Sequence, residues 1–408
     1  MQASQIELIK STIPVLEAHG VELIQHFYHR MLTHNSELRN IFNHAHQASG
    51  RQPQALAGAV LAYAQHIEDP SALWKTLERI AHKHVSLNIR AEHYAIVGKH
   101  LLAAISEVLG DQASDELIEA WAAAYQQLAD VLITLESGLY QQAIDTEGGW
   151  SGWRPFIIDQ KIQESDEITS FYFKPLDGGQ IPTYHPGQYI SIQVYVPSLG
   201  ALQPRQYSLS DAPNGDYLRI SVKREPAAHG QPSGQVSNLL HDEYDEGRIV
   251  TLSQPYGDFY LDQGNLQDLE PHDRTSPVTL ISGGVGITPM MAMLNHLNQH
   301  TPARPVYFYH CARNRHVHAF KAITDRFIDQ PEHRVHYYYD EVDQDVDKAV
   351  QPGPLTLADT LPTSALTGHF YLCGPQGFMA HHIDALKQLG VGDAQIHAET
   401  FGSGGISA

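Results

Sequence analysis

The periodicity of the chain changes near residue 148, and this change divides what the sequence can fold into. Residues 1 to about 143 space their apolar side chains as helices do, with almost none of the alternation that strands need. After a break rich in glycine and tryptophan at 148–155, short runs alternate apolar and polar residues between proline and glycine turns. A helical domain therefore precedes a strand-rich region, and 408 residues suffice for two to three domains.

The charge and the cysteine content exclude several classes of protein. The formal net charge is −20 at pH 7, whereas nucleic acids and anionic membranes reward clusters of Lys and Arg. Cys311 and Cys373 are the only cysteines, so no disulfide framework is implied. The N-terminus lacks a signal-peptide pattern, and no run of about 18 apolar residues occurs. We expect a cytoplasmic monomer without nucleic-acid partners or integral membrane association.

One histidine lies on the core face of a helix predicted after residue 71. Leu73, Leu77 and Ile80 repeat at helical spacing, and His84 lies within about 40° of all three around the helix axis. His82 lies about 200° away from His84, so we expect it to be solvated. A single core histidine is more often a packing residue than a metal ligand, so both interpretations of His84 remain open at this point.

Two polar side chains suit a network behind that histidine. Tyr94 lies on the apolar stripe of a helix predicted at 91–108, and Glu136 faces inward from a helix predicted at 115–143. A buried carboxylate needs hydrogen-bond partners, and a metal-bound imidazole needs an acceptor for its second N–H. Both groups could therefore support His84.

A second set of inward polar groups lies nearer the N-terminus. Tyr28 belongs to a helix predicted at 21–32, and Gln52 shares a helical face with Leu56 and Val60. Pro53 suits the first turn of that second helix.

Residues 205–208, with the sequence Arg-Gln-Tyr-Ser, lie in a predicted strand of the second region. Such a strand can hold a flavin, with Arg205 on a phosphate, Tyr207 against the ring and Ser208 on a ring nitrogen. Taken alone, the same residues also fit an ordinary structural strand. The runs at 168–174, 189–196 and 217–223 predict an antiparallel barrel, and 236–238 predict a helix start able to receive a pyrophosphate.

A glycine loop at 282–286 follows a predicted strand at 277–281. We expect Thr288 to cap the next helix, with Pro289 at its first position. The loop suits a diphosphate, although it lacks the Lys of a P-loop and the spacing of a strict Rossmann fingerprint. Further strands, predicted at 306–310, 335–339 and 369–373, complete a parallel α/β sheet that should bind its ligand at the carboxyl ends of the strands.

In this order, the motifs resemble the flavohaemoglobin family, which joins a globin domain to a ferredoxin-reductase-like module. The likeness covers the whole chain and rests on residues 27–28, 41–43, 52 with 56, 83–86, 94–98, 185–189, 205–210, 223–225, 234–238, 282–289 and 373–375. It implies a multidomain fold, with an all-α globin domain at 1–145, an antiparallel β-barrel FAD domain at 151–262 and an α/β parallel-sheet NAD(P) domain at 270–408.

The resemblance also implies site residues. The haem iron ligand is His84, with Tyr94 and Glu136 as its support. The distal pocket contains Tyr28, Gln52 and Leu56, and Phe42 packs on the haem. The residues implied for FAD are Tyr189, Arg205, Gln206, Tyr207, Ser208, Lys223, Glu225, Gln235, Val236, Ser237, Phe401 and Gly402. Those implied for the nicotinamide nucleotide are Gly284, Val285, Gly286, Ile287, Thr288, Pro289, Cys373, Gly374 and Pro375.

The activity implied by the resemblance is nitric oxide dioxygenase. Its cofactors are haem b, FAD and NADH or NADPH, and it converts NO and O2 to nitrate with electrons that pass from NAD(P)H through FAD to the haem.

Arg313 and Arg315 follow a predicted strand end, where they either meet the 2′-phosphate of NADPH or are solvated loop charges. The alternatives are a reductase whose main acceptor is free flavin, ferric iron or lipid peroxide, and a non-catalytic oxygen sensor or store.

Overall fold

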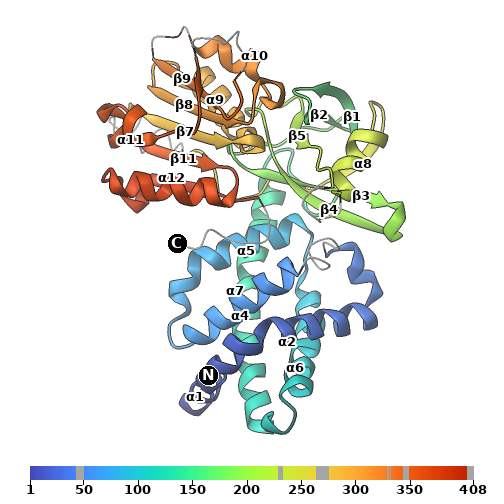
Figure 1. Ribbon diagram of the computed structural model, residues 1–408. Coiled ribbons are helices and arrows are strands. Elements are labelled where there is room, and N and C mark those ends of the chain that lie inside the picture. The colour runs from blue at the N-terminus through green and yellow to red at the C-terminus, as the bar shows by residue number, and fades with distance from the viewer. Residues whose placement is uncertain are drawn as a thin grey trace. The chain divides into compact units, whose positions relative to one another are not determined.

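The computed structural model divides into two compact units (Figure 1). It describes residues 1–42, 50–227, 233–262, 275–328, 330, 332–342 and 349–401. The first unit comprises Met1–Arg154, Ser191–Gln206 and Thr251–Asp258, and the second comprises Pro155–Ile190, Tyr207–Val250 and Phe259–Ala408. The first unit therefore combines the N-terminal helices with two segments from the strand-rich region.

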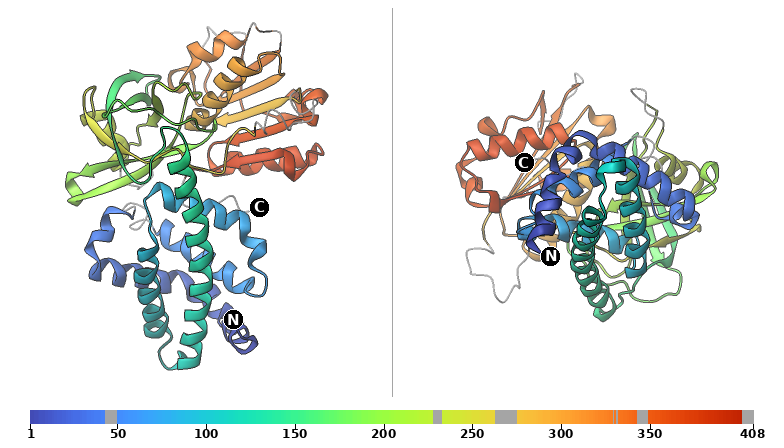
Figure 2. Two further views of the ribbon diagram at one scale, coloured as in Figure 1. Left: turned by 180° about the vertical axis from the view of Figure 1, so that it is seen from behind. Right: turned by 90° about the horizontal axis from the view of Figure 1, so that it is seen from below.

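The helices of the first unit surround an apolar core. The core includes fully buried Ile9, Phe27 and Met31. α7 packs against α1, α5 and α6 and is the long teal helix in the left view of Figure 2. The helices of this unit are α1 (Ala3–Ser11), α2 (Ile13–His34), α4 (Arg51–Gln65), α5 (Trp74–Ser86), α6 (Ala91–Leu109) and α7 (Asp115–Asp145).

These helices agree with the periodicity of the sequence, with one large difference in extent. α2 begins at Ile13, eight residues before the predicted start at residue 21 (21 − 13 = 8), because Pro14 fits its first turn and Leu16 joins the buried core. Pro53 lies in the first turn of α4, as predicted. α5 follows a 3₁₀ turn at Pro70–Leu73 in which Asp69 accepts a hydrogen bond from the Ser71 backbone.

The first sheet is the expected antiparallel one, in the order β4-β3-β6-β1-β2-β5. A bridge between Leu209, which follows β4, and Ile220 in β5 connects the two edge strands, and this accounts for the barrel character. Helix α8 (Gln235–Glu243) begins close to its predicted start. The strands are β1 (Arg154–Gln163), β2 (Ile168–Pro175), β3 (Tyr189–Val196), β4 (Ala201–Ser208), β5 (Leu218–Lys223) and β6 (Ile249–Leu252).

The second sheet is parallel, in the order β10-β9-β8-β7-β11-β12. The chain runs outward from β7 through β8 to β10 on one side and from β11 to β12 on the other, so the strand order reverses between β7 and β11. A crevice outside the carboxyl ends at such a reversal is the usual ligand site of a doubly wound sheet. The strands are β7 (Val278–Gly283), β8 (Val306–Ala312), β9 (His333–Tyr339), β10 (Val350–Pro352), β11 (His369–Cys373) and β12 (Ile396–Glu399).

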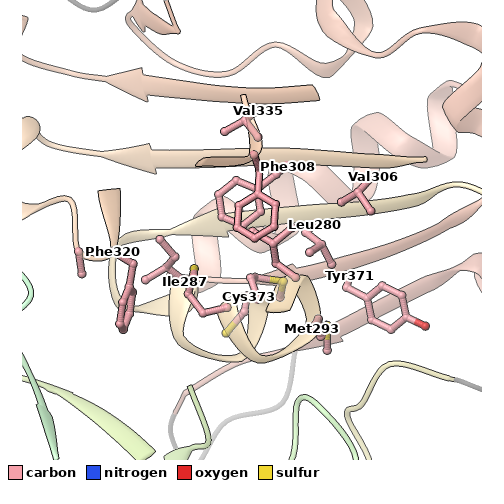
Figure 3. Close-up of a cluster of buried hydrophobic side chains, with 14 of the residues drawn as sticks. Leu280, Ile287, Met293, Val306, Phe308, Phe320, Val335, Tyr371 and Cys373 are labelled. Carbon is pink, nitrogen blue, oxygen red and sulfur yellow. The ribbon is translucent and has the colours of Figure 1, made fainter. Parts of the chain in front are cut away.

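Helices cover both faces of this parallel sheet. Leu280 and Ile281 are consecutive in β7, and they join different apolar clusters because successive strand residues point to opposite faces. One cluster contains most of the buried residues of α9 (Ile287–His300), as Figure 3 shows for Ile287 and Met293. The other contains Met379 of α12 (Gln376–Gln388). The fold class expected from the sequence is therefore confirmed.

The prediction that Thr288 caps α9 is wrong. A 3₁₀ turn at Gly284–Gly286 continues directly into the helix, so α9 begins at Ile287 with Gly286 as its N-cap. The Thr288 hydroxyl donates to the carbonyl of Val285 at 3.0 Å and therefore does not accept from a free backbone N–H. Pro289 still lies in the first turn, where its missing N–H costs little.

A buried ion pair beside the antiparallel sheet also receives a hydrogen bond from a helix of the parallel sheet within the second unit. Arg219 has a side chain only 3% exposed, and its Nη1 lies 3.3 Å from Oδ2 of Asp211. Tyr217 donates its hydroxyl to the same oxygen at 2.7 Å. Asn295 of α9 donates to the other carboxylate oxygen, also at 2.7 Å. The carboxylate thus has partners from the antiparallel sheet and from the helix of the parallel one.

We predict that Arg219→Met destabilises the protein by about 3–5 kcal/mol, because it leaves the Asp211 charge buried without its cation. Calorimetric unfolding tests this expectation. The control is Lys174→Met, which breaks a pair with Asp159 at a side chain that is 40% exposed and should cost less than about 1 kcal/mol. Equal, small effects of both substitutions would show that the buried pair contributes no more to stability than an exposed one.

Candidate haem, flavin and nucleotide sites

His84 is held by two polar side chains from neighbouring helices. Its Nδ1 lies 2.7 Å from Oε1 of Glu136 in α7 and 3.0 Å from the hydroxyl of Tyr94 in α6. Tyr94 donates to the same carboxylate oxygen at 2.5 Å. Glu136 is 2% exposed, so the structure confirms that this carboxylate faces inward. All three side chains meet as their helical positions predicted.

The contacts to Glu136 decide which nitrogen of His84 carries a proton. A carboxylate only accepts hydrogen bonds, so the proton is on Nδ1 and the lone pair is on Nε2. Burial, followed by the negative charge of Glu136, raises the pKa of the Tyr94 hydroxyl, which therefore remains a donor. Among the described residues, no hydrogen bond occupies Nε2. The imidazole is thus prepared as a metal ligand, which fits a globin haem.

Tyr125 completes this network, and no pattern in the sequence indicated its role. Its hydroxyl donates to the backbone carbonyl of Tyr94 at 2.6 Å. A side chain on Gly98 would lie 2.5 Å from the Tyr125 ring, so the glycine leaves the space that the ring fills. The glycine in the segment 94–98 was visible in the sequence, but its partner 27 residues away (125 − 98 = 27) was not.

The structure also brings together most of the residues expected in the distal pocket. Tyr28 is 6% exposed, and its ring centroid lies 5.6 Å from that of Phe42. Burial raises the pKa of the Tyr28 hydroxyl, with a hydrogen bond from Gln52 acting in the opposite direction. Within the part of the chain that the structure describes, Oε1 of Gln52 is buried and has no hydrogen-bond partner. An unsatisfied polar atom beside a buried tyrosine fits a small polar ligand, and Leu56 provides an apolar neighbour on the same helix.

The expectation for His82 is wrong. The side chain is half-buried, and its Nδ1 accepts a hydrogen bond from the backbone of Gly257 at 3.2 Å. Burial lowers the pKa of this imidazole. The helix face opposite His84 is covered by a segment that lies 175 residues further along the chain, so helical periodicity could not predict the contact. Burial also lowers the pKa of Lys83, which directly precedes His84. The helical pattern did not predict this burial.

The expected flavin segment forms the second half of β4. Arg205, Gln206 and Tyr207 are half-buried, and Ser208 is buried. Arg205 donates to the carbonyl of Pro204 at 2.7 Å. Gln206 donates from Nε2 to the hydroxyl of Ser191 at 3.1 Å.

The other residues expected around FAD lie on nearby elements of the antiparallel sheet. Tyr189 opens β3 and is half-buried. Lys223 at the end of β5 lies 3.3 Å from the carboxylate of Glu225. Gln235, Val236 and Ser237 form the first turn of α8, where helix N–H groups without intrahelical partners suit an anion.

The glycine loop of the parallel sheet is built by close contact between main chains. A side chain on Gly286 would lie 2.1 Å from the carbonyl oxygen of Cys373, so only glycine fits at this position. Gly284 is exposed, with a φ of 55°, and Val285 is half-buried. This loop lies at the carboxyl end of β7, where the strand order reverses, and its open backbone suits a nucleotide diphosphate.

The neighbouring expected residues divide between core and surface. Ile287, Thr288, Pro289 and Cys373 are buried, and burial raises the pKa of the Cys373 thiol well above its ordinary value. Their side chains therefore support the loop from behind. Gly374 and Pro375 follow β11 and pack against Gly283.

The last expected contacts lie in loops. Arg313 forms an ion pair with Glu167, so its charge is already compensated within the protein. The structure thus favours the interpretation of Arg313 as a loop charge over a role at a 2′-phosphate. Phe401 is 46% exposed, and Gly402 lies outside the described residues.

Comparison with known proteins agrees with all three regions. Residues 25–132 match the globin family, 155–260 the oxidoreductase FAD-binding domain and 280–383 the oxidoreductase NAD-binding domain. A flavohemoprotein of Chromobacterium violaceum is 54% identical over 404 residues, which cover 97% of each chain. One of Bordetella pertussis is 52% identical over 406 residues, which cover 98% of each.

Two solved structures are also similar. The crystal structure of a flavohemoglobin from Malassezia yamatoensis, with bound FAD and haem, has a TM-score of 0.85 at 29% identity and covers 98% of this chain and 99% of that one. The FAD/NAD-binding domain of nitric oxide dioxygenase from Vibrio cholerae has a TM-score of 0.54 at 38% identity and covers 61% of this chain and 98% of that one.

The fold and these comparisons define a haem- and flavin-dependent oxidoreductase, in which a globin domain shares a chain with FAD- and NAD-binding domains. The chain belongs to the flavohaemoprotein family, also called flavohaemoglobins. Among the described residues, no helix is both long and apolar enough to cross a membrane.

We predict that Glu136→Gln increases the rate of haem loss by about 10- to 100-fold, because the amide removes the charged acceptor that orients His84. Transfer of haem to an excess of a haem-free globin measures this rate. Glu119→Gln, at an exposed position of the same helix, is the control and should leave the rate unchanged. An unchanged rate in Glu136→Gln would show that the carboxylate does not support His84 as the haem ligand.

Proposed function

We propose that this protein is a nitric oxide dioxygenase, which converts NO and O2 to nitrate with electrons from NAD(P)H. The observation that carries this proposal is the pair of polar networks in the helical core. One network prepares Nε2 of His84, and in the other the buried Tyr28 receives a hydrogen bond from Gln52, whose Oε1 is also buried. The similarity to the FAD/NAD-binding domain of a nitric oxide dioxygenase from Vibrio cholerae supports the same activity.

The cofactors, when bound, supply the redox chemistry: the haem binds oxygen and exchanges single electrons, and FAD accepts a hydride and releases electrons one at a time. The protein has to hold each group and orient it. His84 would ligate the iron through Nε2, while Glu136 and Tyr94 maintain its ring orientation and its Nδ1 proton. A strongly hydrogen-bonded Nδ1–H would make the imidazole a more basic ligand for the iron.

The distal residues would orient the reacting ligand. Tyr28 remains a neutral hydroxyl donor, because burial raises the pKa at which it would ionise. In a dry pocket, a hydrogen bond to a ligand that carries partial negative charge is stronger than the same bond in water. Gln52 would hold this donor in place through its amide.

On the reductase side, β4 and the glycine loop would bind the flavin and the nucleotide. Arg205 provides a guanidinium suited to a phosphate, and Tyr207 provides a ring suited to stack on the flavin. Since Arg313 is paired with Glu167, we propose NADH as the principal reductant. We expect a monomer, because the three domains of one chain would bind the haem, the FAD and the nucleotide that the reaction needs. We place the reaction in the cytoplasm.

The alternatives explain fewer of these features. A reductase for free flavin or ferric chelates has no use for a half-buried histidine oriented by a buried carboxylate. An oxygen store needs no FAD- and NAD-binding domains. A lipid peroxide reductase would use the same cofactors, so activity measurements have to separate that function from nitric oxide removal.

We predict that Tyr28→Phe increases the rate of oxygen release from the reduced protein roughly ten- to a hundredfold, as expected for one hydrogen bond to a charged ligand. Stopped-flow spectroscopy measures this rate. Gln52→Ala should have a smaller effect, because it acts through Tyr28. If Tyr28→Phe released oxygen at the wild-type rate, the tyrosine would not contact the ligand.

We predict that purified protein with NADH removes NO only when O2 is present and that nitrate is the product. His84→Ala should abolish this activity but retain NADH-dependent reduction of an artificial dye, because Arg205 and the glycine loop remain intact. Arg205→Ala should weaken FAD retention and leave haem content unchanged. Removal of NO without O2, or without nitrate formation, would refute the proposed reaction.

A further inference from the structure

A continuous chain of buried hydrogen bonds connects the haem-ligand helix with the expected flavin segment inside the first unit. Gln206 donates from Nε2 to the hydroxyl of Ser191 at 3.1 Å, and Ser191 donates to the hydroxyl of Ser86 at 3.0 Å. Ser86 in turn donates to the backbone carbonyl of Lys83 at 2.8 Å. Both serines are completely buried.

The direction of every bond in this chain follows from its chemistry. The Lys83 carbonyl can only accept, so it takes the single hydrogen of the Ser86 hydroxyl. Ser86 must then accept from Ser191, and Ser191 in turn must accept from the amide NH₂ of Gln206. The Gln206 amide therefore has one orientation, with its NH₂ toward Ser191 and its carbonyl on the opposite side.

The two ends of the chain are functional segments. Lys83 is joined by its peptide bond to His84, whose Nε2 is prepared for the haem iron. Gln206 lies between Arg205 and Tyr207 in the segment expected to hold the flavin. The hydrogen bonds therefore link the segment expected to bind the flavin directly to the segment expected to bind the haem.

The centre of the chain is fixed from a third side. The backbone N–H of Ser191 donates to the hydroxyl of Ser253 at 2.9 Å, and Ser253 donates to the carbonyl of Gln254, also at 2.9 Å. Ser191 thus cannot move without breaking buried hydrogen bonds. Polar networks of this kind are costly when only partly satisfied, and when complete they select a single arrangement of their surroundings.

We propose that Ser191 and Ser86 are positioning residues for electron transfer from the flavin to the haem. By bonding Gln206 to the carbonyl next to His84, they hold the two cofactor-binding segments at one separation. This inference rests on the proposed function. In the step concerned, one electron leaves the flavin that NADH has reduced by two electrons and converts ferric iron to ferrous iron. A second electron follows in a later step, and the flavin protons pass to solvent.

The central test measures haem reduction in holoenzyme variants mixed anaerobically with NADH under carbon monoxide, which traps ferrous haem. We expect Ser191→Ala and Ser86→Ala each to slow haem reduction about tenfold, as the loss of one buried hydrogen bond would. Flavin reduction by NADH and FAD content should remain at wild-type values. The double variant should be no slower than either single variant, because both substitutions break the same chain.

Hydrogen exchange provides a readout that does not depend on turnover. In Ser191→Ala, the backbone amides of residues 84–89 and 205–208 should exchange faster, while the midpoint potentials of haem and flavin, measured by spectroelectrochemistry, stay unchanged. Ser253→Ala is the matched control, because it removes a buried hydroxyl that contacts Ser191 outside the chain. Because Ser253→Ala leaves the hydrogen bonds from Gln206 to Lys83 in place, it should slow haem reduction less than Ser191→Ala does. Ser191→Thr, which keeps the hydroxyl, should recover the rate lost in Ser191→Ala.

Several results would overturn the inference. Haem reduction at the wild-type rate in both single alanine variants would show that the chain does not position the segments. Equal slowing of flavin reduction would assign Ser191 to flavin binding instead. A fully additive double variant would show that the serines act separately. Wild-type protein in which NADH reduces FAD but never the haem would refute the proposed function itself, and the inference with it.

Discussion

The helical part of the structure depends on how the charge of Glu136 is satisfied. The carboxylate is almost fully buried, and the same oxygen faces the Tyr94 hydroxyl and Nδ1 of His84. A buried charge of this kind is tolerated only when donors surround it, so three helices must keep their relative rotation for the carboxylate to remain where it is. Because the same contacts assign the proton of His84, the requirement that stabilises the core also prepares Nε2 of His84 for its proposed role as the haem ligand.

Much of the haem side could be predicted, because helical periodicity places side chains reliably on one face. Tyr94 and Glu136 face inward as expected, and Tyr28 and Gln52 adjoin each other. The errors arise where a distant segment decides the environment. His82 was expected to be solvated because nothing in its own helix reveals that the Gly257 backbone covers it. Likewise, Thr288 has the residue type and the location of a helix cap, but a preceding 3₁₀ turn moves the helix start two residues toward the N-terminus, from residue 289 to residue 287 (289 − 287 = 2).

The hydroxyl chain shows the same limit more clearly. Ser86 lies in a motif that the sequence already singled out, but its partner Ser191 is 105 residues away and belongs to an ordinary alternating strand. Serine carries no periodic signal, and a single buried hydroxyl cannot be told from an exposed one by composition. The segment at 205–208, expected to bind flavin, was recognisable from its residue types, whereas the attachment of Gln206 through Ser191 to α5 required the three-dimensional structure.

The close contact between Gly286 and the Cys373 carbonyl has a consequence for how the nucleotide site can change during evolution or in the laboratory. Any side chain at position 286 would push β11 away from the start of α9. Substitutions at this position should therefore disrupt the fold, whatever their effect on nucleotide preference. Gly284, only two positions earlier, is surrounded by open space, and its left-handed backbone can be adopted by asparagine or aspartate. Substitutions in this loop should therefore be tolerated mainly at its exposed residue, Gly284. In a mutant library that varies every glycine of the loop, most members would fail to fold because of their substitution at position 286.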